Sequence, residues 1–338
     1  MDTGTEQQGR KAGYVEVQEA VAGLAATLTD AAFQGARLQW AALGATPDEQ
    51  ATSSAIIDPE ALLLVSLWLI PREPALADTV HDWVAKWSDL LSVQRTRNIA
   101  RSFPAATLVQ LRAVAITAFE RGKDFRWSPV IKGGDGAGDA DTAHADVARS
   151  TDTRLPVGAA RLAVERDALL VLRFRMAFGV GARADALAYL LARGAAWSTV
   201  TEIAQATGYT PSAIRRALDR MAEADIVMTV DDGATRYRCD AASWGALLGL
   251  QGVVEPWQYW LQHFAFIATF VEWADSIARR KLTGYAITEQ LRAVARGFRP
   301  TDDRDELRSW DGAFRDGSSM DEMTSALLAI AAPMLRGS

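Results

Sequence analysis

The sequence has little cysteine and histidine, and each shortage excludes a class of protein. The single thiol, Cys239, cannot form an intrachain disulfide, so the chain is not a disulfide-stapled secreted scaffold. Three histidines, His81, His144 and His263, are too few and too scattered in sequence to predict a zinc site. We therefore expect neither a structural metal nor any other cofactor.

Long apolar runs are also missing. The most apolar stretch, 55–70, is interrupted by Asp-Pro-Glu at 58–60, and the remainder, 61–70, is too short to span a bilayer core of roughly 30 Å. The opening MDTGTEQQGRK lacks the apolar segment of a signal peptide. We expect a cytoplasmic protein with no membrane partner.

Sequence motifs of common enzymes are absent as well. The chain contains no G-x-x-x-x-G-K-[ST], G-x-G-x-x-G, G-x-S-x-G or H-E-x-x-H. The glycine pair in GVGARAD, 179–185, precedes a predicted helix but has no phosphate-binding lysine. We expect no enzymatic activity and assign no catalytic residue.

Lysine is scarce too, because only five of the 36 basic residues are lysine and 31 are arginine. With a net charge of −6, the whole chain repels nucleic acid at long range. The distribution of arginine therefore carries more information about nucleic-acid binding than its total.

The pattern that is present is mainly helical. From about residue 14 to 128, apolar residues recur at spacings of three and four, and Asp58-Pro59-Glu60 is typical of a helix N-terminus. A helical pattern returns after residue 241. Between them, KGGDGAGDADTAHADVARSTDTRLPVG, 132–158, has almost no large apolar residue and is interpreted as a flexible linker.

Residues 184–226 contain three predicted helices in close succession. Thr199 and Glu202 match a capping box at the start of the second helix, and Gly208 supplies a left-handed turn at its end. Thr210 caps the third helix, with proline at its first position. On a helical wheel of the third helix one face is apolar and the other is polar. The apolar face carries Ile214, Ala217, Leu218 and Met221, and the polar face carries Ser212, Arg215, Arg216, Asp219 and Arg220.

The next residues predict a two-stranded hairpin. IVMT and TRYR are strand-prone, and Asp232-Gly233 between them is a turn signal. Two helices, a turn, a third helix and a hairpin follow one another in the order of a winged helix-turn-helix.

The segment GARADALAYLLARGAAWSTVTEIAQATGYTPSAIRRALDRMAEADIV, 181–227, resembles the DNA-binding domain of bacterial winged-helix transcriptional regulators of the MarR-like and ArsR-like kind. The resemblance implies a sequence-specific regulator, expected to act as a repressor, that binds double-stranded DNA as a homodimer and responds to a small-molecule or protein effector. The DNA-binding residues it implies are Thr210, Ser212, Arg215, Arg216, Arg220, Arg236 and Arg238.

One departure keeps an alternative open. Asp231 and Asp232 stand at the tip of the predicted hairpin, where relatives often carry basic residues. In the alternative, the protein is an interaction adaptor that docks partners on the winged helix and on tryptophan-bearing helices. The tryptophan pairs at 83/87 and 257/260 lie on one helix face each, although core packing is the favoured interpretation.

The predicted organisation is therefore a mainly α chain with a central winged helix-turn-helix. It comprises a helical N-terminal domain at 1–129, a flexible linker at 130–160, the winged helix-turn-helix at 161–245 and a helical C-terminal region at 246–338. Arginines 95, 97 and 101 are assigned to a surface helix of the first domain, with a second, degenerate helix-turn-helix as the alternative.

Overall fold

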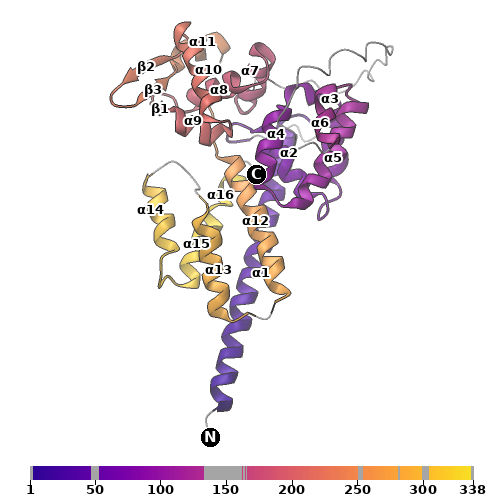
Figure 1. Cartoon of the computed structure of the whole chain (residues 1–338), viewed down its shortest axis with the longest axis vertical. Helices are drawn as coiled ribbons and strands as arrows, with labels where there is room; N and C mark the ends of the chain where they lie inside the picture. The colour runs from indigo at the N-terminus through magenta and orange to yellow at the C-terminus, as the bar shows by residue number, and fades with distance from the viewer. Residues whose placement is uncertain are drawn as a thin grey trace.

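The computed structural model describes most of the chain as mainly helical (Figure 1), which confirms the mainly α class. The described residues are 3–46, 53–132, 162, 164, 166–249, 254–280, 282–298 and 304–335, with the backbone alone for 3–15 and 304. The predicted linker at 130–160 lies outside this description except for its first three residues.

Three groups of elements follow one another along the chain. The first contains α1 (Thr3–Ala42), α2 (Pro59–Leu69), α3 (Leu76–Trp87), α4 (Val93–Ile99), α5 (Ala105–Glu120) and α6 (Ser128–Ile131). The second contains α7 (Leu170–Phe178), α8 (Ala182–Ala192), β1 (Ser198–Thr199), α9 (Val200–Thr207), α10 (Pro211–Glu223), β2 (Met228–Asp231), β3 (Thr235–Arg238) and α11 (Ala241–Leu248). The third contains α12 (Trp260–Ala278), α13 (Gly284–Arg296), α14 (Arg304–Ala313), α15 (Met320–Ala329) and α16 (Ala332–Leu335).

The first and third groups share one hydrophobic core, and we call them together the helical body. The long helix α1 runs beside α12 and also contacts α13, α15 and α16 (Figure 1). Buried residues of this core come from both ends of the chain, from Val21 to Met334. The N-terminal and C-terminal regions, which the sequence pattern presents as separate, are therefore one packed structure.

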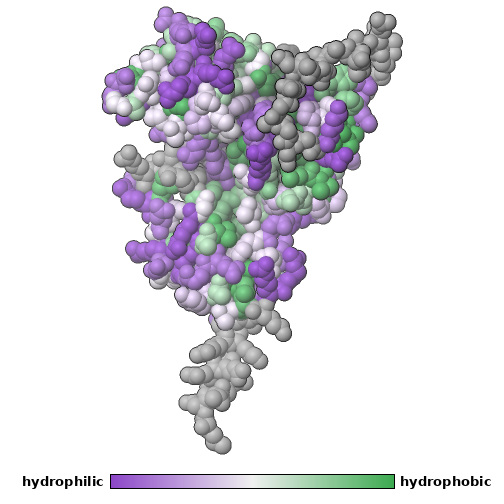
Figure 2. Space-filling view, viewed as in Figure 1, coloured by the Kyte–Doolittle hydropathy of each residue, from purple (hydrophilic) through white to green (hydrophobic). Residues whose placement is uncertain are grey.

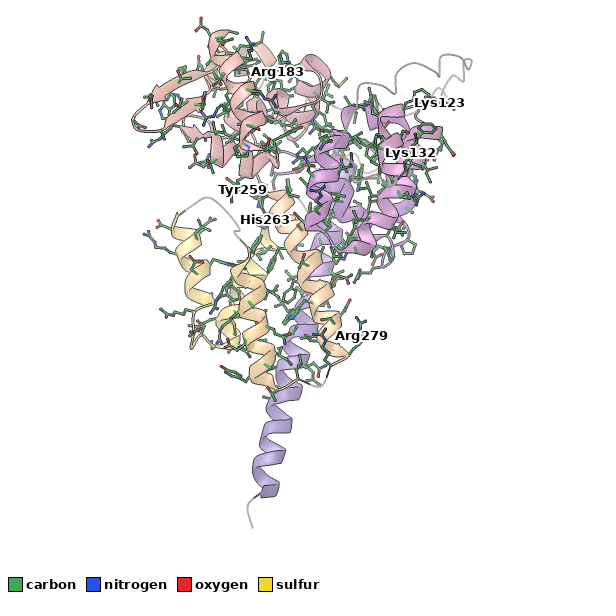
Figure 3. The ribbon with its side chains drawn as sticks, viewed as in Figure 1. Lys123, Lys132, Arg183, Tyr259, His263 and Arg279 are labelled. Atoms are coloured by element: carbon green, nitrogen blue, oxygen red, sulfur yellow. The ribbon has the colours of Figure 1, made fainter. Side chains whose placement is uncertain are left out.

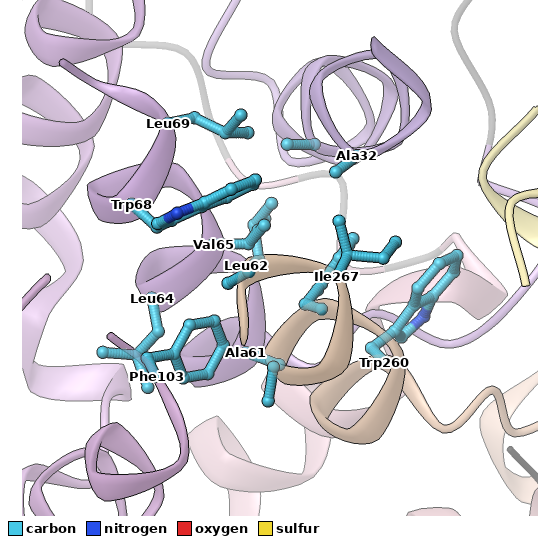
Figure 4. Close-up of a cluster of buried hydrophobic side chains, with 14 of the residues drawn as sticks. Ala32, Ala61, Leu62, Leu64, Val65, Trp68, Leu69, Phe103, Trp260 and Ile267 are labelled. Carbon is cyan, nitrogen blue, oxygen red and sulfur yellow. The ribbon is translucent and has the colours of Figure 1, made fainter. Parts of the chain in front are cut away.

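Helix α2 lies at the centre of the body, and all of its residues are buried. It begins as the sequence predicts, because the Asp58 carboxylate accepts a hydrogen bond from the Ala61 amide at 3.1 Å and proline occupies its first turn. Figure 4 shows Leu62 and Val65 of α2 beside Ile267 of α12, with Ala32 of α1 on the same side as Ile267. Burial on every face explains why this helix is apolar throughout except for Glu60 and Ser66.

The second group forms a separate core, and we call it the central unit. Its core contains buried residues of α7, α8, α9 and α10 together with Tyr237 of β3 and Cys239. Ile56, which precedes α2 of the helical body, also packs in this core. The three strands form one antiparallel sheet in the order β1-β3-β2, with Thr229 opposite Tyr237 and Thr199 opposite Arg236.

Local features predicted for the central unit are confirmed. Thr199 and Glu202 form a capping box at the start of α9, and Gly208 ends this helix with φ of 71°. The Thr210 side chain caps α10. The apolar face of α10 is buried as predicted, with Ile214 and Leu218 fully inaccessible.

Candidate nucleic-acid interface

The outer face of α10 carries most of the residues predicted to bind DNA. Ser212, Arg215, Arg216 and Arg220 are all exposed, while Ile214 and Leu218 of the same helix are buried. Figure 2 shows hydrophilic side chains gathered over the central unit, at the upper left of the view. The helix thus presents a polar surface over an apolar base.

The N-terminus of α10 is held by its own hydroxyl groups. The Thr210 hydroxyl accepts from the Ala213 amide at 3.3 Å and lies 3.2 Å from the Ser212 hydroxyl. The Arg216 Nε donates to the Ser212 carbonyl at 3.4 Å. These contacts are local, so the two hydroxyl groups and the Arg216 guanidinium stay accessible on the surface.

Acidic neighbours divide the predicted DNA-binding arginines into two sets. Arg220 pairs with Glu223 at 3.0 Å, and Arg236 pairs with Asp232 at 3.4 Å. In the part of the chain that the structure describes, Arg215 and Arg216 have no carboxylate within ion-pair distance. Exposed pairs such as the first two contribute little and exchange partners readily, so they reduce the local positive charge without blocking the side chains.

Arg238 is not brought to the face of α10. Its guanidinium lies over the Trp197 ring, 4.6 Å from the ring centroid, and the residue is only partly exposed. The hairpin tip is acidic as expected, since Asp231 and Asp232 are both exposed. Of the two hairpin arginines predicted to bind DNA, only Arg236 is exposed.

A buried charge cluster joins the central unit to the body, and sequence reasoning missed it. The cluster consists of Asp58, Glu60, Arg95, Arg175 and Asp185. Arg175 of α7 bonds Glu60 at 2.6 Å and Asp185 of α8 at 2.6 Å. Arg95 of α4 bonds Asp58 through both terminal nitrogens, at 2.7 and 2.5 Å.

The cluster reaches the turn between α9 and α10. The Arg95 Nε donates to the Thr207 carbonyl, at the end of α9, at 2.6 Å. Its guanidinium also lies 5.8 Å from the centroid of the Tyr209 ring. The prediction that Arg95 belongs to a surface helix is wrong, because the side chain is only 2% exposed. Buried arginines need acidic partners, and those of Arg95 are Asp58, the N-cap of α2, and Glu60 in the first turn of the same helix.

The opposite charges of the cluster stabilise one another. Burial by itself would raise the pKa of Glu60, but the adjacent charges of Arg175 and Arg95 and their hydrogen bonds lower it to about 2. Burial opposes the charge of Arg95, yet Asp58 and Glu60 hold its pKa above the ordinary value. The ion pairs of the cluster fix α7 and α8 against α2 and α4.

A groove runs along one side of α10. It has a volume of about 800 Å³ and lies between the 178–183 segment and the outer face of the helix. Arg183, Arg216 and Arg220 line it together with Asp219 and Glu223. We call it the basic groove, because three cations there face two carboxylates. Arg183 was not predicted as a site residue from the sequence, although GVGARAD marked its position.

The tryptophan pairs mainly serve packing. Trp83 is buried and meets Trp40 edge-on at 5.5 Å, and Trp260 is buried and stacks on Phe264 at 5.3 Å. Their partners in sequence, Trp87 and Trp257, are half-buried. The favoured interpretation of these residues as core packing is therefore confirmed.

We also searched the described ranges for a metal site, a reactive thiol and a membrane-spanning helix. There, no group of three or more His, Cys, Asp or Glu residues could hold a metal ion. Burial raises the pKa of the Cys239 thiol to about 12, which keeps it protonated and a poor nucleophile. Within those ranges no helix has the length and apolar character needed to cross a membrane.

Comparison with known proteins identifies no relative: the chain matches no protein-family model, no curated protein and no solved structure.

Proposed function

We propose that the protein is a sequence-specific DNA-binding transcriptional regulator and that its central unit is a winged helix-turn-helix. In this proposal α9 and α10 form the helix-turn-helix, and β2 and β3 form the wing. The order α8, α9, α10, β2, β3 and the capped turn at Gly208 support the assignment.

The single observation that carries the proposal is the outer face of α10. It begins with the exposed hydroxyl groups of Thr210 and Ser212 and continues with Arg215 and Arg216, which have no acidic partner in the described structure. Short side chains at a helix N-terminus allow close approach to a groove, and arginine donates two parallel hydrogen bonds to a guanine edge. In this proposal, Arg215 and Arg216 read bases, while Arg220 and Arg236 contact phosphates.

Rigid attachment of the turn supports the same function. Because Arg95 bonds the end of α9 and the Gln262 amide donates to the Gln205 carbonyl at 2.6 Å, the body fixes the direction of α10. A reading helix needs a defined orientation to place side chains against particular bases. Two copies related by a twofold axis would double the contacts, so the proposed DNA-bound form is a homodimer.

A protein-interaction adaptor is the second candidate. The adaptor is favoured by a reduced positive charge around α10. This reduction comes from the acidic hairpin tip and from two ion pairs, Arg220 with Glu223 and Arg236 with Asp232. The buried tryptophans weigh against it, since Trp83 and Trp260 offer no docking surface. In that case α10 itself would be the docking surface.

In the deciding experiment, the wild-type protein selects a DNA duplex from a random oligonucleotide library. The affinity of this duplex is then measured for the wild type and for arginine-to-alanine variants. Arg215→Ala with Arg216→Ala should weaken specific binding by about 1–3 kcal/mol for each lost base contact and relax the preference at those bases. Arg220→Ala should instead weaken binding to all sequences and reduce the salt slope by about one unit.

The matched control removes two exposed arginines from the helical body, Arg101→Ala with Arg112→Ala. It changes the net charge by the same amount as the α10 double variant and should leave specific affinity unchanged. Melting curves should coincide for all variants, because none of these side chains is buried. Equal DNA affinity of the α10 double variant and the wild type would refute base reading and favour the adaptor.

A further inference from the structure

Helix α5 of the helical body is apolar on two faces, and the core covers only one of them. Leu111, Val114 and Ala115 lie on the covered face and are buried. On the outer face, Leu108 is 48% exposed and Val109 is 71% exposed. A helix that is apolar all round is normally buried all round, so the outer face of α5 is expected to have a partner.

The apolar surface continues to the end of α5 and past it. Ile116 is 37% exposed, and Phe119 follows it by three residues, on the same side of the helix. Phe125 is 49% exposed and meets Phe119 edge-on, with the ring centroids 5.2 Å apart. Single exposed apolar residues are ordinary, but several that lie together mark an interaction surface.

Two unpaired charges lie in the same row as these apolar residues. Leu108, Arg112, Ile116 and Glu120 follow one another at a spacing of four and form one ridge along the outer face. All four are exposed, and in the described part of the chain neither Arg112 nor Glu120 has an opposite charge within ion-pair distance. The ridge therefore carries a cation one turn before Ile116 and an anion one turn after it.

We propose that the outer face of α5 binds the same face of a second copy of this chain. A twofold contact joins a surface to itself, so the surface must be complementary to its own copy. With the axis at Ile116 and the two helices antiparallel, Arg112 of each copy faces Glu120 of the other. An acidic partner or an anionic membrane would instead place negative charge against Glu120.

Helix geometry permits this contact. Ridges of residues four apart pack between those of an equivalent helix at a crossing angle of about −50°. The turns next to the crossing carry Arg112 and Glu120, so both ion pairs form beside the apolar centre at Ile116. A single helix pair buries less than about 1,200 Å² in total, so we expect a dissociation constant on the order of 10 μM.

Sedimentation equilibrium of the full chain at low salt, without DNA, tests the contact. The average mass of the wild type should rise from 36.6 kDa toward twice this value as the concentration passes about 10 μM. Ile116→Lys places two like charges at the axis and should weaken association at least about tenfold. Leu328→Lys on α15, where the leucine has a similar exposure of 39%, is the matched control and should not. A wild type that stays monomeric well above that concentration overturns the proposal.

Charge reversal tests the proposed pairing directly. Arg112→Glu alone, or Glu120→Arg alone, turns both ion pairs into like-charge contacts and should weaken association at least about tenfold. Both changes in one chain should restore it, and so should an equimolar mixture of the two single variants. Arg296→Glu, which breaks an exposed pair with Asp316, makes the same charge change elsewhere and should have no effect. A doubly changed chain as weak as the single variants refutes the pairing.

A cross-link locates the axis independently of charge. The native thiol, Cys239, is buried, so an oxidant in solution reaches mainly a thiol introduced on α5. Ile116→Cys brings two thiols together at the axis and should give a covalent dimer under mild oxidation. Val109→Cys is more exposed but lies two turns from the axis, so it should stay mainly monomeric. Equal cross-linking of the two variants would mean that the helices do not pair around Ile116.

The contact leaves the reading face of α10 uncovered, and the step that follows from this rests on the proposed DNA-binding function. Helix α5 packs against α2, α3 and α6, and Figure 1 shows it at the right of the view, whereas α10 lies at the upper left. A dimer joined through α5 therefore carries two free reading faces and brings two duplexes together.

Energy transfer between two differently labelled copies of the selected duplex measures this bridging. The wild type should give a transfer signal at concentrations at which it self-associates. Arg112→Glu should bind a single duplex with unchanged affinity and give no signal, and adding Glu120→Arg should restore the signal. If the wild type self-associates but binds no DNA, the α5 contact stands and the proposed function fails. If it does both without energy transfer, the bridging step is wrong.

Discussion

At the scale of single residues, burial decides which ionisable groups change charge as the pH falls. His263 of α12 is almost completely buried beside Tyr259 (Figure 3), and its Nδ1 lies 2.7 Å from the Tyr259 carbonyl oxygen. Burial lowers the pKa of His263 to about 4, because the charged imidazolium would lose its hydration. The folded protein therefore resists protonation at a pH where the unfolded chain accepts it.

This difference predicts a loss of stability in mild acid. Above pH 6.5 the imidazole is neutral in both states and contributes no pH dependence. Between pH 6.5 and 4 the unfolded state binds the extra proton, so His263 lowers the free energy of unfolding, by about 3 kcal/mol at pH 4. Urea titrations of wild type and His263→Gln at pH 7 and pH 4 should show a smaller loss in the variant.

The two proteins should show the same pH dependence between pH 7 and 8, which serves as the control. Glu60 acts in a lower window, because its folded pKa is depressed to about 2 and its contribution is lost only as pH falls below 4.5. An equal loss in wild type and His263→Gln from pH 7 to 4 would show that the imidazole is accessible to protons.

Sequence reasoning succeeded where the interacting residues lie within a turn or two of one another. The caps formed by Asp58, Thr199 and Thr210 were predicted because each bonds a backbone amide three residues ahead. The burial of Arg95 was not predictable in this way. Its partners Asp58 and Thr207 are 37 and 112 residues away, and no local pattern encodes such distances.

At the scale of elements, the turn between α9 and α10 has two separate reasons to contain glycine. Gly208 adopts φ of 71°, which disfavours any residue with a side chain. A Cβ there would also lie 3.0 Å from Ile99 Cγ2 of α4 and 3.1 Å from Leu261 Cδ2 of α12. The left-handed turn was predicted from sequence, but the close approach to the body was not.

The two reasons can be separated with a second glycine. Gly194, at the end of α8, has φ of 59°, but a Cβ at this position would meet nothing within 4 Å. Gly194→Ala should cost about 1 kcal/mol from backbone strain alone, and Gly208→Ala should cost about 1–3 kcal/mol more because neighbouring side chains must move. Equal losses in thermal or urea unfolding would mean that α4 and α12 do not press on the turn.

At the scale of the whole molecule, the chain folds back so that its two ends form one core. Helix α1 packs along α12 more than 200 residues later, and Trp260 of α12 donates to the Ile56 carbonyl at 2.9 Å. The helical periodicity of each segment predicts an amphipathic helix but not its partner. The helical class was therefore predictable, whereas the joining of the N-terminal and C-terminal regions was not.

The buried charge cluster makes the body and the central unit depend on each other. Arg175 belongs to the central unit, and it bonds Glu60 and the Leu90 carbonyl of the body as well as Asp185 of its own unit. Arg175→Met would leave three buried carboxylates with Arg95 alone. The loss of one partner from a buried ionic cluster costs about 3–5 kcal/mol, because the remaining charges cannot be solvated.

Arg121→Met is the matched control, since Arg121 forms an exposed pair with Asp82 at 2.7 Å and should contribute less than about 1 kcal/mol. Urea unfolding followed by tryptophan fluorescence and by circular dichroism should separate the two variants. In Arg175→Met the central unit should also unfold before the body, so that the two signals no longer coincide. Coincident transitions with a loss no larger than that of Arg121→Met would mean that apolar packing alone, through residues such as Ile56, joins the two parts.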